Sequence, residues 1–185
     1  STASVTTTGS IGDSLMTAIA SATNGGGGGA FQTAGGASFK AAAGSTLTLD
    51  GQATGSAASA SSGTRGVRMD GGATADGAIT IKGSSKSSDG LMFINGRVTA
   101  EANSALTLLG TTAGNGGAAT GLVMVNSGGV ALKNGATLSI TGQAANTGTP
   151  SSAETAVNIS GSGIAYAAGA TASGDITITG TTTSA

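Results

Sequence analysis

One six-residue phrase occurs five times in this chain, and it constrains the fold more than any other feature. In every copy the second and fourth residues are Leu or Ile, the third is Thr or Ser, and the sixth is Gly. The copies start at Thr46, Ala78, Ala105, Thr137 and Asp175. Alternation of apolar and polar residues, ended by a turn residue, predicts a half-buried β-strand. A weaker sixth copy over residues 4–9 extends the series towards the N-terminus.

Two shorter segments precede each copy of the phrase. In the first, two apolar residues flank one outward residue, and Asp, Asn or Ser then favours a turn; it occurs at 67–70, 92–95, 123–126 and 157–160. In the second, small or apolar residues alternate, at 39–41, 73–75, 98–100, 130–132 and 164–166. The repeating unit therefore predicts three short strands joined by tight bends and followed by a loop of variable length.

A single unit of this kind cannot bury its own apolar face. Units stacked at the usual strand spacing of about 4.8 Å build a continuous narrow core. We therefore predict an all-β fold, a single-stranded parallel β-helix of about six coils. It should occupy residues 1–185 as one segment of a longer solenoid or filament, with an insertion loop at 10–30. Within that loop, Ile11, Leu15 and Ile19 stand four residues apart and predict a short helix across 13–22.

The composition alone is compatible with disorder, because Gly, Ala, Ser and Thr make up about two thirds of the chain. Disorder by composition also requires a high net charge, whereas the formal charge here is −1. The repeats assign these small residues to corners, outward strand positions and variable loops. The few Leu, Ile and Val residues then fall on the inward positions of a thin core.

The residue types exclude several classes of function. The chain contains neither Cys nor His, which excludes disulfides, thiolate nucleophiles, His-ligated metals and Ser–His–Asp triads. Only seven Lys and Arg occur, so no nucleic-acid partner is expected, and no apolar run approaches the roughly 20 residues of a membrane span. The carboxylates are scattered, with Asp50 expected beside Lys82 as a surface ion pair. We expect no enzyme activity, no cofactor and no metal.

Two surfaces are candidates for interaction. Equivalent positions of the repeated phrase should form one outward hydroxyl ladder, made of Thr48, Thr80, Thr107, Ser139 and Thr177. Such a ladder could bind ice or carbohydrate, although the β-propensity of Thr alone would also produce it. Phe93 and Met124 are predicted at one outward position of adjacent coils, with Arg68 and Asn158 beyond them. Exposed apolar side chains stacked in this way require a cover, either a loop of the same chain or a partner.

The unit at 121–143, GLVMVNSGGVALKNGATLSITGQ, resembles the repeats of the filamentous-haemagglutinin-like family of large secreted bacterial exoproteins. The resemblance extends over roughly residues 30–180. It implies a right-handed β-helix, secretion to a Gram-negative cell surface by the two-partner route, and a role as adhesin or stalk. The features of a family secretion domain are not seen near the N-terminus, which favours an internal segment.

These observations lead to one functional hypothesis and one alternative. No polar helix caps either end, so we expect end-to-end self-association or continuation of the same solenoid. The first hypothesis is a non-enzymatic structural or adhesive β-helix of a secreted or cell-surface bacterial protein, acting as a shaft or as a self-assembling filament unit. Its partner would be a host-surface or glycan receptor. The alternative is a binding module for ice or carbohydrate on the Thr ladder.

Overall fold

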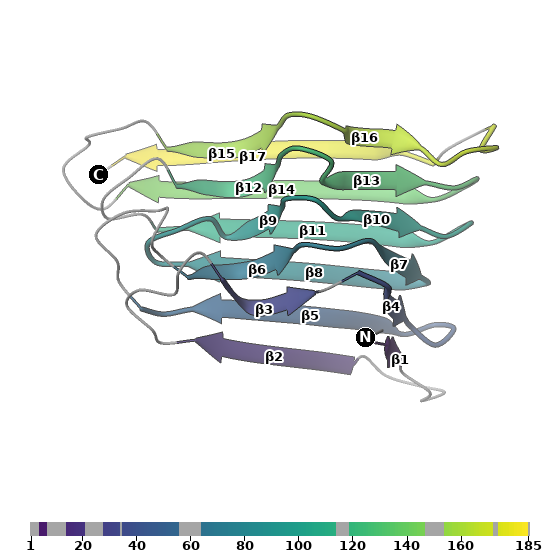
Figure 1. The fold of residues 1–185 in the computed structure, drawn as a ribbon, viewed down its shortest axis with the longest axis horizontal. Coiled ribbons are helices and arrows are strands. Elements are labelled where there is room, and N and C mark those ends of the chain that lie inside the picture. The colour runs from purple at the N-terminus through teal and green to yellow at the C-terminus, as the bar shows by residue number, and fades with distance from the viewer. Residues whose placement is uncertain are drawn as a thin grey trace.

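The computed structural model describes residues 4–6, 14–20, 28–33, 35–55, 64–113, 119–146, 154–171 and 174–184 of the chain. These residues form an all-β fold, and no helix occurs among them. The chain winds repeatedly through three parallel sheets, and each coil lies on the one before it (Figure 1). The predicted parallel β-helix is confirmed. Its right-handed sense stays a prediction, and it is the sense that parallel crossover connections almost always take.

The three sheets are named here A, B and C, and each coil passes through them in the order C, A, B. Sheet C contains β3 (Gly29–Thr33), β6 (Arg65–Met69), β9 (Leu91–Phe93), β12 (Thr120–Met124) and β15 (Thr155–Ile159). Sheet A contains β1 (Ser4–Thr6), β4 (Ala37–Lys40), β7 (Ala73–Asp76), β10 (Arg97–Ala100), β13 (Gly129–Leu132) and β16 (Gly163–Tyr166). Sheet B contains β2 (Ser14–Ala20), β5 (Thr46–Ala53), β8 (Ala78–Ser85), β11 (Ala105–Thr112), β14 (Thr137–Asn146) and β17 (Ile176–Ser184).

The core is a set of columns in which equivalent side chains of successive coils stack on one another. The second and fourth positions of the repeated phrase supply two of these columns, and their members are at most 2% exposed from β5 to β14: Leu47, Ile79, Leu106 and Leu138; Leu49, Ile81, Leu108 and Ile140. Full burial of each such side chain contributes about 1.5–3 kcal/mol to the free energy of folding. One large residue per column and coil is therefore enough to hold the stack together.

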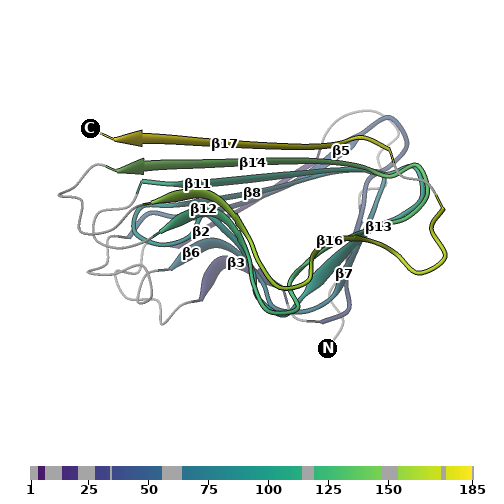
Figure 2. The same cartoon turned by 90° about the horizontal axis from the view of Figure 1, so that it is seen from above.

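The sixth-position glycine lies inside a strand of sheet B, and the prediction that it ends the strand is wrong. The strands continue two or more residues beyond it, and the glycines are buried: Gly51, Gly83, Gly110 and Gly142. A Cβ on any of them would overlap the backbone of sheet C, at Gly66, Gly90, Gly121 and Ala156 respectively. Sheets B and C thus meet backbone to backbone along this column, and Figure 2 shows β17 and β14 running straight beside sheet C. Glycine is needed for this close approach rather than for a turn.

The N-terminal part differs from expectation in two respects. Residues 14–20 form strand β2, which pairs in parallel with β5, so the predicted helix across 13–22 is wrong. A spacing of four residues fits the helical period, but it is also a multiple of the strand period of two. The predicted sixth copy at 4–9 is also misplaced, because β1 pairs with β4 in sheet A. Strand β2, within the predicted insertion loop, extends sheet B instead; residues 7–13 and 21–27 lie outside the described residues.

Candidate interaction surfaces

The hydroxyl ladder is present in the predicted register. Thr48 pairs with Thr80, Thr80 with Thr107, Thr107 with Ser139, and Ser139 with Thr177 on the outer face of sheet B. The first four residues are half-buried by their neighbours on the flat face, and Thr177 is exposed. The pairing of equivalent strands in a β-helix makes this alignment a direct consequence of the repeat.

The outer face of sheet B is broader than the sequence predicted. Because the strands run past the glycine column, a further outward rank lies beyond the ion-pair column: Gln52, Ser84, Thr111, Gln143 and Thr181. In β11, β14 and β17 the outward positions from the ladder to this rank carry no charge: Thr107, Leu109, Thr111, Ser139, Thr141, Gln143, Thr177, Thr179 and Thr181. We call these nine positions the hydroxyl array. Only the rank beyond the glycine column was missed, because Ser84-Ser85, Thr111-Thr112 and Thr181-Thr182 show no apolar alternation after the glycine.

Charged side chains form pairs between neighbouring coils. The predicted pair of Asp50 and Lys82 is present with an Nζ–Oδ2 distance of 3.6 Å. Lys40 lies 2.8 Å from Asp76, and this hydrogen bond and the attraction between the charges raise the pKa of Lys40. The Lys40–Asp76 pair is exposed and contributes little to stability. Asp50 is only 8% exposed, so its pair with Lys82 is partly buried rather than the surface ion pair that was predicted. Glu101 pairs with Lys133 on the next coil.

Phe93 and Met124 do pair in register, but their predicted outward orientation is wrong. Both side chains are fully buried in the core, at 0% exposure. The strands align Val67 with Leu91, whereas the sequence analysis aligned it with Met92. A slip of one residue moves every side chain to the opposite face of a strand. Phe93 and Met124 are therefore core residues, and they are not accessible to a partner.

The residues that precede Phe93 and Met124 in the sequence belong to the outward-facing column of sheet C. Arg68, Met92, Val123 and Asn158 align in successive coils. Met92 is only 9% exposed and Val123 only 6%. Both apolar side chains in the column are thus already covered. The expected pair of apolar residues exists on this face, but it is not a free surface.

The most buried ionic group lies where sheet C begins. Arg65 Nε contacts Asp89 Oδ2 at 3.2 Å, and the two side chains are 11% and 14% exposed. The other carboxylate oxygen of Asp89 accepts the backbone N–H of Thr120 at 3.0 Å. Asp89 therefore connects strands of three successive coils. Both oxygens of the Asp89 carboxylate thus have a donor, and the group links neighbouring coils.

Glu154 is a second carboxylate that is partly withdrawn from water. Its Oε2 is buried without a hydrogen-bond partner in the described part of the chain. Burial raises the pKa of Glu154. A raised pKa in the folded state means that protonation of Glu154 favours folding, and this contribution is lost as the pH rises through the folded-state pKa.

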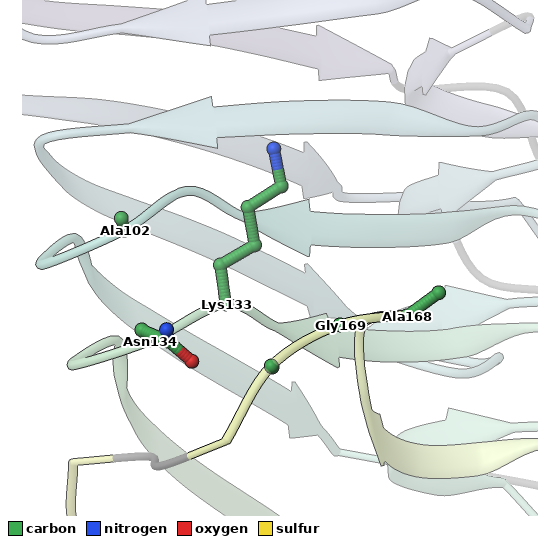
Figure 3. A pocket seen from close by; sticks show the side chains of 6 residues that line it. Ala102, Lys133, Asn134, Ala168 and Gly169 are labelled. Carbon is green, nitrogen blue, oxygen red and sulfur yellow. The ribbon is translucent and has the colours of Figure 1, made fainter.

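No candidate metal centre is found among the described residues. They contain no group of three or more carboxylates that could hold a metal ion. Figure 3 shows a shallow hollow of about 170 Å³ at one corner of the coil, lined by Ala102, Lys133, Asn134, Ala168, Gly169 and Ala170. Asn134 Oδ1 accepts the backbone N–H of Thr171 at 2.8 Å, and Lys133 is paired with Glu101. The polar groups here connect the corners of neighbouring coils. The described residues also contain no helix that could cross a membrane.

The last coil exposes a group of apolar side chains that the sequence analysis did not single out. Four large apolar residues are exposed, and we call them the open-end cluster: Ile159 (36%), Tyr166 (57%), Ile176 (42%) and Ile178 (49%). Each stands above a core residue that is at most 2% exposed, namely Met124, Leu132, Leu138 and Ile140. They are inward-facing residues of a coil with nothing described above it.

Comparison with protein-family models, with curated proteins and with solved structures finds no match.

Proposed function

We propose that this chain is a non-enzymatic structural segment of a secreted or cell-surface bacterial protein, acting as a shaft or as a filament unit. The observation that supports it is the uninterrupted repetition of the core, glycine and hydroxyl columns from coil to coil. Among the described residues, no single coil carries a reactive side chain that distinguishes it from the other coils. Such a rod would hold its surface loops at fixed intervals, where a host-surface or glycan receptor could bind several of them at once.

Deletion of one complete coil tests this proposal. Residues 113–144 run from the end of β11 to the position of Ala144, which pairs with Thr112, so their removal leaves the next coil in register on the previous one. We expect the shortened chain to fold cooperatively with a lower Tm, because solenoid stability is a sum over coils and their interfaces. Circular dichroism shows whether the shortened chain is folded, and thermal melting measures its Tm and the cooperativity of unfolding.

The matched control removes only residues 113–128, which eliminates β12 but leaves β13 and β14. This deletion interrupts the order of the sheets and should prevent cooperative folding. Unfolding of the complete-coil deletion as well would contradict a shaft built of interchangeable coils. Depolymerisation of a polysaccharide by the intact chain would contradict the non-enzymatic assignment.

A second candidate function is binding of a periodic surface, ice or crystalline carbohydrate, by the hydroxyl array. Its support is the outward rank beyond the glycine column and the absence of charge from all nine positions. Adjacent strands about 4.8 Å apart and side chains about 6.7 Å apart along each strand make a regular grid, in which seven of the nine positions carry a hydroxyl group and the other two are Leu109 and Gln143. A grid of this kind is suited to an ordered surface rather than to a small ligand.

The substitution Thr141→Lys places a charge near the middle of the hydroxyl array and tests this second function. If the array binds, wild-type protein should show thermal hysteresis in ice or should sediment with crystalline cellulose, and Thr141→Lys should lose at least about tenfold of that activity. Thr99→Lys adds the same charge on the outer face of sheet A, and this variant should retain the wild-type activity. No activity in either assay, or equal loss in both variants, would rule out the array.

A further inference from the structure

The open-end cluster lies at an edge of the β-helix that no further described strand extends. Strand β17 is nine residues long and forms one edge of sheet B, and β16 and β15 form the corresponding edges of sheets A and C. Stable proteins usually protect such edges with charged residues, proline or a covering element. The sequences of β15, β16 and β17 contain no charged residue and no proline. Within the described residues, the backbone edge and the inward columns at this end thus have no further strand layer on them.

The N-terminal end of the same chain has a complementary edge. Strand β2 is the other edge of sheet B, and β1 is the other edge of sheet A. Neither strand contains a charged residue or proline. All strands of a sheet run in parallel, so β2 of a second copy can lie on β17 in the same direction as β17 lies on β14. The two ends thus fit each other as successive coils do.

We propose that the C-terminal end of one copy pairs with the N-terminal end of a second copy, β17 with β2 and β16 with β1. Following the columns from strand to strand, Ile176 lies at the register position of Ser14, Ile178 at that of Met16, and Tyr166 at that of Val5. In sheet C the described edge strand is β3, one coil later, so the joint is made by two of the three sheets. This inference rests on the proposed structural role and identifies the partner as this chain itself.

The joint joins two different surfaces, and its repetition therefore yields an open linear polymer rather than a closed ring or dimer. Each joint would bury the side chains of three members of the open-end cluster, as their equivalents in the same columns are buried at no more than 2% exposure. Two C-terminal ends facing each other would form a dimer and would not continue the parallel register. The mass of the assembly distinguishes these arrangements.

The substitution Ile178→Lys tests the joint, with Thr179→Lys as the matched control. Both add one charge to β17, but residue 178 is in an inward column and residue 179 in an outward one. We expect light scattering and electron microscopy to show wild-type and Thr179→Lys protein growing into linear rods as concentration rises. Ile178→Lys should stay a folded monomer of about 16.9 kDa. Circular dichroism checks that both variants are folded.

Three results would overturn the joint: a monomeric wild type at all concentrations, a closed dimer, or undiminished rods from folded Ile178→Lys. A wild type that is monomeric while its complete-coil deletion still folds would overturn the joint and leave the shaft proposal standing. Failure of the complete-coil deletion to fold would overturn the shaft proposal, whatever the mass of the wild type.

Discussion

Replacing Gly110 by Ala should lower the free energy of unfolding by at least about 3 kcal/mol, although it adds a single methyl group. The added Cβ would overlap the carbonyl group of Gly121 on the facing strand of sheet C. Every nearby atom belongs to the backbone, so no flexible side chain can move aside. Overpacking of a rigid contact costs about 1–3 kcal/mol or more. Urea denaturation of the purified variant measures the change, together with a Tm lowered by about 6–12 °C.

Gly72→Ala is the matched control for this experiment. The nearest atom that its Cβ would meet is the Arg97 carbonyl oxygen at 3.9 Å, which is an ordinary contact. Its stability should therefore change by less than about 1 kcal/mol. Equal stability of the Gly110 and Gly72 variants would contradict the close approach of sheets B and C.

Replacing Phe93 by Ala should destabilise the chain by about 3–5 kcal/mol, the cost of removing a large aromatic side chain from a packed core. Phe93 is 0% exposed and lies between Met69 and Met124 of the neighbouring coils. The stack above and below is held by ladder hydrogen bonds, so it cannot collapse fully into the cavity. Chemical denaturation monitored by circular dichroism gives the free energy.

Leu109→Ala serves as the comparison, because Leu109 is a large apolar residue on the outer face of sheet B and is only half-buried. We expect it to cost less than about 1 kcal/mol. If Phe93→Ala were as mild as Leu109→Ala, the side chain of Phe93 would lie on the surface and not in the core.

The accuracy of the sequence-based prediction depended on how many positions of a repeat agreed. The phrase that contains Leu106 and Leu108 has Leu or Ile at its second and fourth positions and Thr or Ser between them in all five copies, so its strand, its inward face and the register of the ladder could all be predicted. The segment around Phe93 has large apolar residues at four consecutive positions, Leu91 to Ile94, and no alternation fixes its register. Side-chain direction there is decided by pairing with Val67 and Met69.

The role of Gly110 and the exposure of the open-end cluster could not be predicted, because both depend on what surrounds the repeated unit. The sequence does not show whether Gly110 ends a strand or allows two backbones to approach closely, because glycine serves both purposes. The open-end cluster was not predicted either, since exposure of Ile176 and Ile178 depends on what lies above their columns. Properties of the repeated unit could thus be read from the sequence, whereas properties of its surroundings could not.

The ion pairs between coils have a consequence for the order in which the coils stack. The core columns are so similar that a coil could pair almost equally well with a wrong neighbour, two levels away, during folding. Asp50 contacts Lys82 only when β8 lies directly on β5, because the next strand offers Leu109 at that position. Arg65 likewise contacts Asp89 only on the adjacent coil. In a chain with few charges, these pairs disfavour incorrect alignments more than they stabilise the correct one.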